Sequence, residues 1–158
     1  MSNSMTLGAY WRPRRESLEQ CADRFLAFMT GLGECDSNLV QWYYKGRSRK
    51  DALTRKIAVR DRDELLALLD KGRHRRDIGK TVIEDLGFSV GIWNGGGPGR
   101  EASLSIACGL YWVSPSPNAS LSNSVVLNLP EDLGELADPV KASWLLALTA
   151  RCWAPDWA

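Results

Sequence analysis

Three strand-like segments follow one another closely in the second half of the chain, and they constrain the fold more than any other feature. In Ala102–Trp112, apolar side chains alternate with small ones, which is the period of a strand with one buried face. Phe88–Trp93 precedes this segment and Ser124–Leu129 follows it. Because turns and a polar loop over 115–122 separate the three segments, we expect them to pair as an antiparallel sheet.

The connection between the first two of these strands is rich in glycine. It reads WNGGGPGRE over 93–101. A phosphate-binding loop needs G-x-x-x-x-G-K-[ST], or G-x-G-x-x-G ahead of a helix. The segment fits neither pattern, since a strand follows it, whereas Asn94-Gly95 is a hairpin signal. We therefore interpret the stretch as a turn, with Trp93 packed at the end of the sheet.

Helical patterns flank the strands. Ser17 and Gln20 form a possible capping box, and an apolar stripe continues to Leu32, with Gly31 and Gly33 expected to end the helix. The other expected elements are a strand Met5–Trp11, a strand Leu39–Tyr44, a short helix capped by Ser48 and running through Leu53, a helix Asp61–Leu69, a loop Arg73–Arg76 and a helix Pro139–Cys152. Together they predict an α+β fold, one domain over residues 1–158 with an antiparallel β-sheet packed against helices.

The distribution of charge is uneven, although the net charge is only +1. Residues 45–80 hold 13 Lys or Arg and 6 Asp or Glu, a balance of +7. Residues 81–158 hold 3 and 8, a balance of −5. The chain as a whole therefore has no electrostatic preference for a polyanion, but it can present patches of opposite sign.

Catalytic patterns are absent from the sequence. It has no G-x-S-x-G motif, and the four cysteines form no CxxC pair. His74 stands among arginines and is interpreted as an exposed bystander, while the acidic groupings fit solvated faces or helix starts. We expect buried free thiols at Cys21 and Cys108. We expect no enzyme activity, no cofactor, no metal site and no small-molecule substrate.

The N-terminal residues have no apolar core that could act as a signal sequence, and no apolar run approaches the ~20 residues needed to span a bilayer. We therefore expect a cytoplasmic protein with no membrane association.

The basic segments permit one binding hypothesis. In Tyr43–Lys50 two aromatic residues precede four cations, and 73–76 add more positive charge. Rings that stack on bases and cations that hold phosphates are the parts of single-strand recognition. The acidic remainder of the chain opposes binding to a polyanion, so nucleic-acid binding is kept as the alternative.

The sequence resembles the immunity protein 52 family of bacterial polymorphic toxin systems. The likeness rests on short motifs in order along the chain: Gly8-Ala9-Tyr10-Trp11, Arg14, Glu16-Ser17, Cys21-Ala22, Phe25, Trp42-Tyr43, Lys45–Lys50, Ala52-Leu53, Gly72-Arg73, Arg75-Arg76-Asp77, Gly87-Phe88-Ser89, Trp93-Asn94-Gly95 and Asn123-Ser124-Val125-Val126.

The resemblance implies a protein that binds and neutralises a cognate toxin. The toxins paired with this family look like nucleases of the restriction-endonuclease fold, delivered by contact-dependent, type VI secretion. Two kinds of contact are conceivable, an acidic face that mimics the substrate or arginines that grip carboxylates of the toxin, with aromatic anchors beside them. The candidate contact residues are Trp42, Tyr44, Arg47, Arg49, Arg73, Arg75, Arg76, Glu131, Asp132 and Glu135, with Asp138 as a further member of the acidic face.

Overall fold

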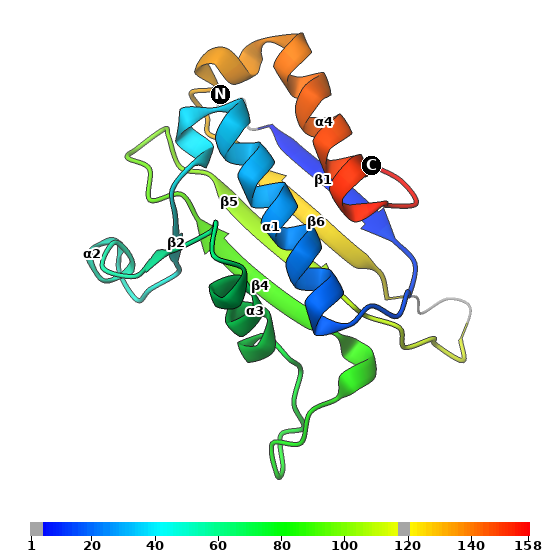
Figure 1. Cartoon of the computed structure of the whole chain (residues 1–158). Helices are drawn as coiled ribbons and strands as arrows, with labels where there is room; N and C mark the ends of the chain where they lie inside the picture. Colours follow the sequence, from blue (N-terminus) through cyan, green and yellow to red (C-terminus); the bar gives the residue numbers. More distant parts are fainter. Residues whose placement is uncertain (1–4, 117–120) are drawn as a thin grey trace.

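Six strands form one antiparallel sheet in the computed structural model, which describes residues 5–116 and 121–158 (Figure 1). The strand order is β1-β6-β5-β4-β2-β3. The strands are β1 (Thr6–Trp11), β2 (Trp42–Tyr44), β3 (Lys56–Ile57), β4 (Phe88–Trp93), β5 (Ser103–Cys108) and β6 (Asn123–Asn128). Every neighbouring pair is antiparallel, which confirms the expected sheet.

The three longest helices cover one face of this sheet. The α-helices are α1 (Leu18–Cys35), α2 (Arg49–Ala52), α3 (Arg62–Lys71) and α4 (Pro139–Trp153), and the short 3-10 helices are Ser37–Leu39, Glu84–Leu86 and Gly134–Ala137. Figure 1 shows α1 in front of the middle of the sheet, with α4 over β1 and α3 beside β4. The core fills the space between these helices and the sheet, so the expected α+β architecture is confirmed.

The pleat of the sheet separates a buried face from an open one. Ile92, Leu104 and Leu127 lie opposite one another on β4, β5 and β6 and are fully buried beneath the helices. Their neighbours along each strand point to the other side and are more exposed. The alternation in the sequence of β5 therefore corresponds to a sheet with one covered face.

Helix α1 begins as expected but ends later. The backbone N–H of Gln20 donates to Ser17 Oγ at 3.1 Å, and the backbone N–H of Ser17 donates to Gln20 Oε1 at 2.8 Å, which confirms the capping box. The helix continues to Cys35, so the prediction that Gly31 and Gly33 end it was wrong. Gly31 instead lies against Leu148, where the missing side chain lets α1 and α4 approach closely.

Two expected strands are shorter than predicted. Leu39 belongs to a 3-10 helix, and its carbonyl accepts a hydrogen bond of 2.9 Å from the Trp42 indole N–H, so only the last three residues of Leu39–Tyr44 are strand. The strand predicted for Ala102–Trp112 ends at Cys108, because Gly109 turns the chain with a φ of +71°.

Several local predictions concern loops and caps. Ser48 caps α2 and Asp61 caps α3, and β4 and β5 are joined by the glycine-rich turn. The carboxamide of Asn94 organises that turn with four hydrogen bonds to backbone groups. The basic loop over 73–76 makes isolated β-bridges at Arg73 and Arg75, so it is more ordered than a plain loop. The polar loop over 115–122 falls partly outside the described residues.

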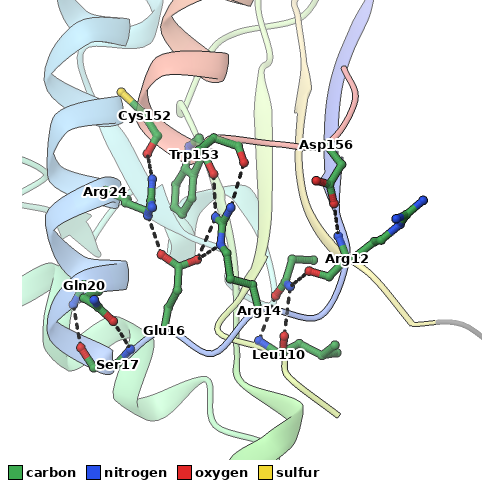
Figure 2. Close-up of polar contacts among 12 residues, drawn as sticks. Arg12, Arg14, Glu16, Ser17, Gln20, Arg24, Leu110, Cys152, Trp153 and Asp156 are labelled. Carbon is green, nitrogen blue, oxygen red and sulfur yellow. Dashed lines mark hydrogen bonds and ion pairs between the residues drawn. The ribbon is translucent and has the colours of Figure 1, made fainter. Parts of the chain in front are cut away.

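A buried carboxylate joins the two ends of the chain (Figure 2). Glu16 lies just before α1, and its side chain is 5% exposed between the guanidinium groups of Arg14 and Arg24. The same guanidinium groups donate to the last carbonyls of α4, including that of Trp153 at 2.7 Å. The network therefore satisfies the C-terminal end of α4 and fixes α4 against α1. Beside it, Trp11 stacks on Trp153 with ring centroids 5.7 Å apart.

Candidate partner-binding surface

The face of the sheet opposite the helices carries mostly small, polar and aromatic side chains. All are exposed or half-buried, and none is acidic. We call this set the open face. Read across the strands, its rows are Lys56, Tyr43, Trp93, Ser103, Asn128 and Thr6; then Gly91, Ser105, Val126 and Gly8; then Ser89, Ala107, Ser124 and Tyr10.

Aromatic pairs border the open face. Tyr43 and Trp93 lie near the β3 end of the first row, with ring centroids 6.5 Å apart. On the β1 side, Tyr10 stacks on Trp157 at 6.0 Å, and the Tyr10 ring lies over Gly8. Small residues fill the area between the two pairs, so the middle of the face is low and is flanked by rings.

The topology brings the two basic segments of the sequence to one edge. Strand β2 pairs with Ile92 and Trp93 at the end of β4, while Arg73 forms a bridge with Phe88 at its start. We call the exposed lysines and arginines within residues 45–56 and 73–80 the basic edge. Lys45 lies over Gly91 and extends the positive charge onto the open face.

The sole histidine of the chain meets the open face near the same edge. His74 Nε2 lies 3.0 Å from the Oγ of Ser89, which is the first residue of the third row. Ser89 has a sheet neighbour in Ala107 and no carboxylate beside it in its row. A catalytic triad needs a nucleophile, a base and an acid that orients the base. This single contact pairs a hydroxyl with an imidazole and lacks the orienting acid, so it does not build a triad.

Most of the candidate arginines form no ion pair with a described residue, although the Arg75 guanidinium donates a hydrogen bond to the Lys80 carbonyl at 3.3 Å. Arg73 is the exception, since it pairs with Asp70 at 2.6 Å and lies over the Phe88 ring at 5.3 Å. The remaining four are exposed, and none forms an ion pair with another described residue: Arg47, Arg49, Arg75 and Arg76. Their charges are therefore available to a partner, whereas that of Arg73 supports the fold.

The two aromatic candidates, Trp42 and Tyr44, lie on the side of the sheet that the helices cover. Trp42 is completely buried, so it belongs to the core and offers no contact surface. Tyr44 is half-buried on the helix side, where burial and, secondarily, Glu64 raise the pKa of its hydroxyl. Between them, Tyr43 points to the open face because side chains alternate along a strand. The alternation of side chains along a strand is the sequence signal by which Tyr43, rather than Trp42 or Tyr44, could have been assigned to the open face.

The acidic candidates gather at one end of the sheet, ahead of α4. The backbone N–H of Asp132 donates to the Gly99 carbonyl at 2.8 Å, which places Glu131 and Asp132 beside the β4–β5 turn. Glu135 pairs with Lys141 at 2.6 Å, and this contact lowers the pKa of the Glu135 carboxyl. Since Arg73 borders the start of β4, the structure separates this acidic group from the basic loop 73–76.

The remaining features are an open hollow at the start of α1 and a buried pair of thiols. An open hollow of about 500 Å³ at the start of α1 is lined by residues of both charges, including Arg15, Glu19 and Glu84. Within 5–116 and 121–158, no group of three or more His, Cys, Asp or Glu is placed to hold a metal ion. A hydrogen bond with Cys21, followed by burial, raises the pKa of the Cys108 thiol well above its ordinary value. Such a thiol is a poor nucleophile.

The comparisons with known proteins identify the family. The family model for immunity protein 52 matches residues 3–158, which is nearly the whole chain. The chain belongs to the immunity protein 52 family. Membership in a family of immunity proteins supports a role in immunity to a toxin, achieved by binding that toxin. The comparison with curated proteins gave no match.

Many of the immunity protein 52 motifs in this sequence consist of residues that stabilise the fold. Trp11 and Phe25 lie in the core, Glu16 holds the arginine network, and Asn123 is a buried side chain that bonds to backbone groups.

Across the described part of the chain, no helix is long and apolar enough to cross a membrane.

Proposed function

We propose that this immunity protein neutralises a nuclease-type toxin by docking its basic edge and open face against carboxylates around the toxin's active site. The observation that carries the proposal is the convergence of both basic segments on one edge of β4. They lie beside a sheet face that has no acidic side chain. The nuclease class of the toxin rests on the resemblance stated above.

The chemistry of nucleases suits such a surface. Their metal ions are held by carboxylates, which must stay accessible for the phosphodiester to bind. A guanidinium group binds a carboxylate through two parallel hydrogen bonds, so an arginine placed there competes with both metal and substrate. Arg47, Arg49, Arg75 and Arg76 supply these groups, and the rings of Tyr43 and Trp93 supply apolar contact area.

The test is charge reversal with a matched control. The double variants Arg47→Glu/Arg49→Glu and Arg75→Glu/Arg76→Glu are expected to raise the Kd for the toxin at least tenfold, since each replaces attraction by repulsion. Arg12→Glu changes an exposed cation at the far edge of the sheet and is expected to leave the Kd within about twofold. Titration calorimetry measures binding, and protection of a DNA substrate measures neutralisation. Unchanged affinity in both double variants would exclude the basic edge.

The acidic end is a second candidate contact for the same function. Glu131 and Asp132 are exposed, neither forms an ion pair with another described residue, and Glu135 lies four positions or fewer away. This group could occupy a basic nuclease cleft in place of DNA. Reversal of all three charges should then abolish binding, whereas an unchanged Kd would rule out the acidic version.

Nucleic-acid binding remains the alternative function. It is favoured by one observation, namely that Tyr43, Trp93 and Lys45 bring rings and a cation together on an open sheet. A filter-binding assay with single-stranded DNA and RNA separates the alternatives, because affinity driven by phosphates falls steeply with salt. Absence of binding at moderate salt favours the toxin as the partner.

The resemblance also suggests where the protein acts. We infer a non-enzymatic inhibitor that works in the cytoplasm of the producing cell, against a polymorphic toxin delivered by type VI secretion. A neighbouring gene for a large secreted protein with a nuclease-like C-terminal domain would support this setting. Recovery of the protein in the periplasmic fraction would contradict the cytoplasmic part.

A further inference from the structure

Residues 74–83 form a two-stranded hairpin that extends away from the rest of the molecule. The backbone N–H of Arg76 donates to the Thr81 carbonyl at 2.9 Å, and that of Ile83 donates to the His74 carbonyl at 2.8 Å. Figure 1 shows this segment beyond the end of α3, clear of the sheet and of the other helices. All of its residues up to Thr81 are exposed. The hairpin is therefore a protrusion and not part of a packed layer.

The base of the hairpin is fixed to the body of the protein on both sides. Before its first strand, the Gly72 carbonyl accepts a hydrogen bond of 3.0 Å from the backbone N–H of Ser89. A Cβ at Gly72 would overlap the Ser89 carbonyl oxygen, so glycine permits this approach. After its second strand, the Asp85 carbonyl accepts hydrogen bonds of 2.9 Å from the backbone N–H groups of Tyr111 and Trp112. A protrusion held in this way loses little conformational entropy when it binds a partner.

The tip of the hairpin, residues 77–80, presents one apolar side chain. Ile78 is 91% exposed, more than any other large hydrophobic residue in the described part of the chain. Gly79 and Lys80 have φ values of +80° and +54°, which turn the chain directly after it. Isolated exposed apolar residues are common on protein surfaces. Ile78 differs from them because it stands at the end of a braced protrusion, where it is the first group that a partner meets.

Cations surround this apolar tip. Arg75, Arg76 and Lys80 are all exposed, and the one acidic residue among them is Asp77, so residues 75–80 hold a charge balance of +2. None of these four side chains forms an ion pair with another described residue. The surface that complements the tip is therefore an apolar pocket bordered by carboxylates.

We propose that this hairpin enters the substrate cleft of the toxin, where Ile78 fills an apolar pocket. The proposal rests on the function proposed above and adds to it the part of the basic edge that enters the cleft. The two strands of a hairpin lie about 5 Å apart, so the ribbon is narrower than a nucleic-acid duplex and a cleft that holds DNA admits it. The cations beside Ile78 then face the carboxylates that hold the metal ions.

Two other kinds of partner fit the tip less well. A bilayer gains little from one isoleucine, since even a whole myristoyl chain gives only marginal membrane binding. Single-stranded nucleic acid stacks its bases on aromatic rings, and the tip has none. The carboxylate of Asp77 also repels phosphates. A protein pocket with an acidic rim is the partner that uses both the apolar side chain and the cations.

This arrangement makes Ile78 the residue that selects the toxin. Carboxylates that hold metal ions are common to nucleases of one chemistry, so the cations paired with them do not distinguish one toxin from another. The size and shape of an apolar pocket do distinguish them. Each methylene group removed from a buried side chain weakens binding about fourfold. Shortening Ile78 should therefore weaken binding in steps.

Titration calorimetry against the toxin domain encoded by the neighbouring gene tests the tip. Ile78→Val is expected to raise the Kd about fourfold and Ile78→Ala more than about tenfold. Val140→Ala, at a 74% exposed position on α4, is the matched control and should leave the Kd within about twofold. Circular dichroism verifies the fold of each variant. An unchanged Kd for Ile78→Ala overturns the inference.

The result is separable from that of the proposed function. If the charge-reversal double variants weaken binding and Ile78→Ala does not, the basic edge stands and the tip contact is excluded. If Ile78→Ala weakens binding and both double variants do not, the tip contact stands and the role of the cations is excluded.

The kinetics of DNA cleavage test entry into the cleft. Ile78→Ala, as a weaker inhibitor, should raise the KM for DNA and leave kcat unchanged, because inhibitor and DNA then compete for one site. A lower kcat at constant KM would show that the toxin binds both together, which overturns the inference. Binding of the unchanged protein to phosphatidylserine vesicles or to single-stranded DNA, lost in Ile78→Ala, would assign the tip to that partner and also overturn it.

Discussion

The two glycines of α1 give a sharp test of how the helices pack, because the same substitution has opposite expected effects at the two positions. A Cβ at Gly31 would lie 2.4 Å from Leu148 Cδ1, 2.8 Å from Cδ2 and 3.2 Å from Cγ. A Cβ at Gly33 would meet its nearest neighbour, in Val40, at 3.7 Å, which is an ordinary contact. Gly31→Ala therefore forces a buried leucine to move, whereas Gly33→Ala requires no movement.

The magnitudes follow from two terms. Replacing glycine by alanine inside a helix stabilises it by about 1 kcal/mol at either site, with less near the helix end. Overpacking a close-packed core costs ~1–3 kcal/mol, and the short distances to three atoms of Leu148 place Gly31→Ala in the upper part of that range. The net expectation is a loss of about 2 kcal/mol for Gly31→Ala and a gain of up to ~1 kcal/mol for Gly33→Ala.

Urea unfolding followed by tryptophan fluorescence measures both variants. With an m-value of about 2 kcal/mol/M, the midpoints should differ by about 1.5 M, with that of Gly31→Ala the lower. Gly31→Ala in a Leu148→Ala background should cost less than in the native protein, because the methyl group then enters a cavity. Equal midpoint shifts for the two glycine variants would refute the close approach of α1 and α4.

Three further predictions concern buried polar groups and thiols. Glu16→Gln should lower the free energy of unfolding by about 2 kcal/mol, a value reduced because Arg14 and Arg24 are about one third exposed; Glu19→Gln, at the surface, should change it by less than ~0.5 kcal/mol. Asn123→Ala should cost about 2–4 kcal/mol in the same assay, since it removes three hydrogen bonds to backbone groups. Partial burial raises the pKa of the Cys35 thiol above its ordinary value, so its alkylation by iodoacetamide, followed by mass spectrometry, should reach its maximal rate at a higher pH in the folded protein than in the urea-unfolded protein. The same pH profile in both states would contradict the burial of Cys35.

The strands of the central sheet were predictable because local pattern and burial agree. The alternation in β5 and the capping box of α1 both correspond to what the structure shows. Predictions failed where a distant contact decided the outcome. Gly31 lies inside α1, where its missing side chain leaves room for Leu148 of α4, more than one hundred positions further along the chain. A local pattern contains no information about such neighbours.

The candidate surface was predictable in composition but not in arrangement. The sequence identified the cations of 45–50 and 73–76, yet only the pairing of β2 and Arg73 with the same strand places them on one edge. Trp42 is buried because its side chain lies on the face of β2 that the helices cover. Which face that is depends on the register of β2 with β4. Register is a long-range property, so it could not be inferred from three residues.

The position of β1 at the edge of the sheet affects the order in which the chain can fold. This strand is synthesised first, but it pairs with β6, which begins at Asn123, and with the tail around Trp157. At about 5–20 residues per second, a ribosome takes ~6–22 s to make the intervening chain. Until then the edge strand has no partner, and long-range pairing of this kind slows folding. The sheet can therefore be completed only several seconds after its first strand has been made.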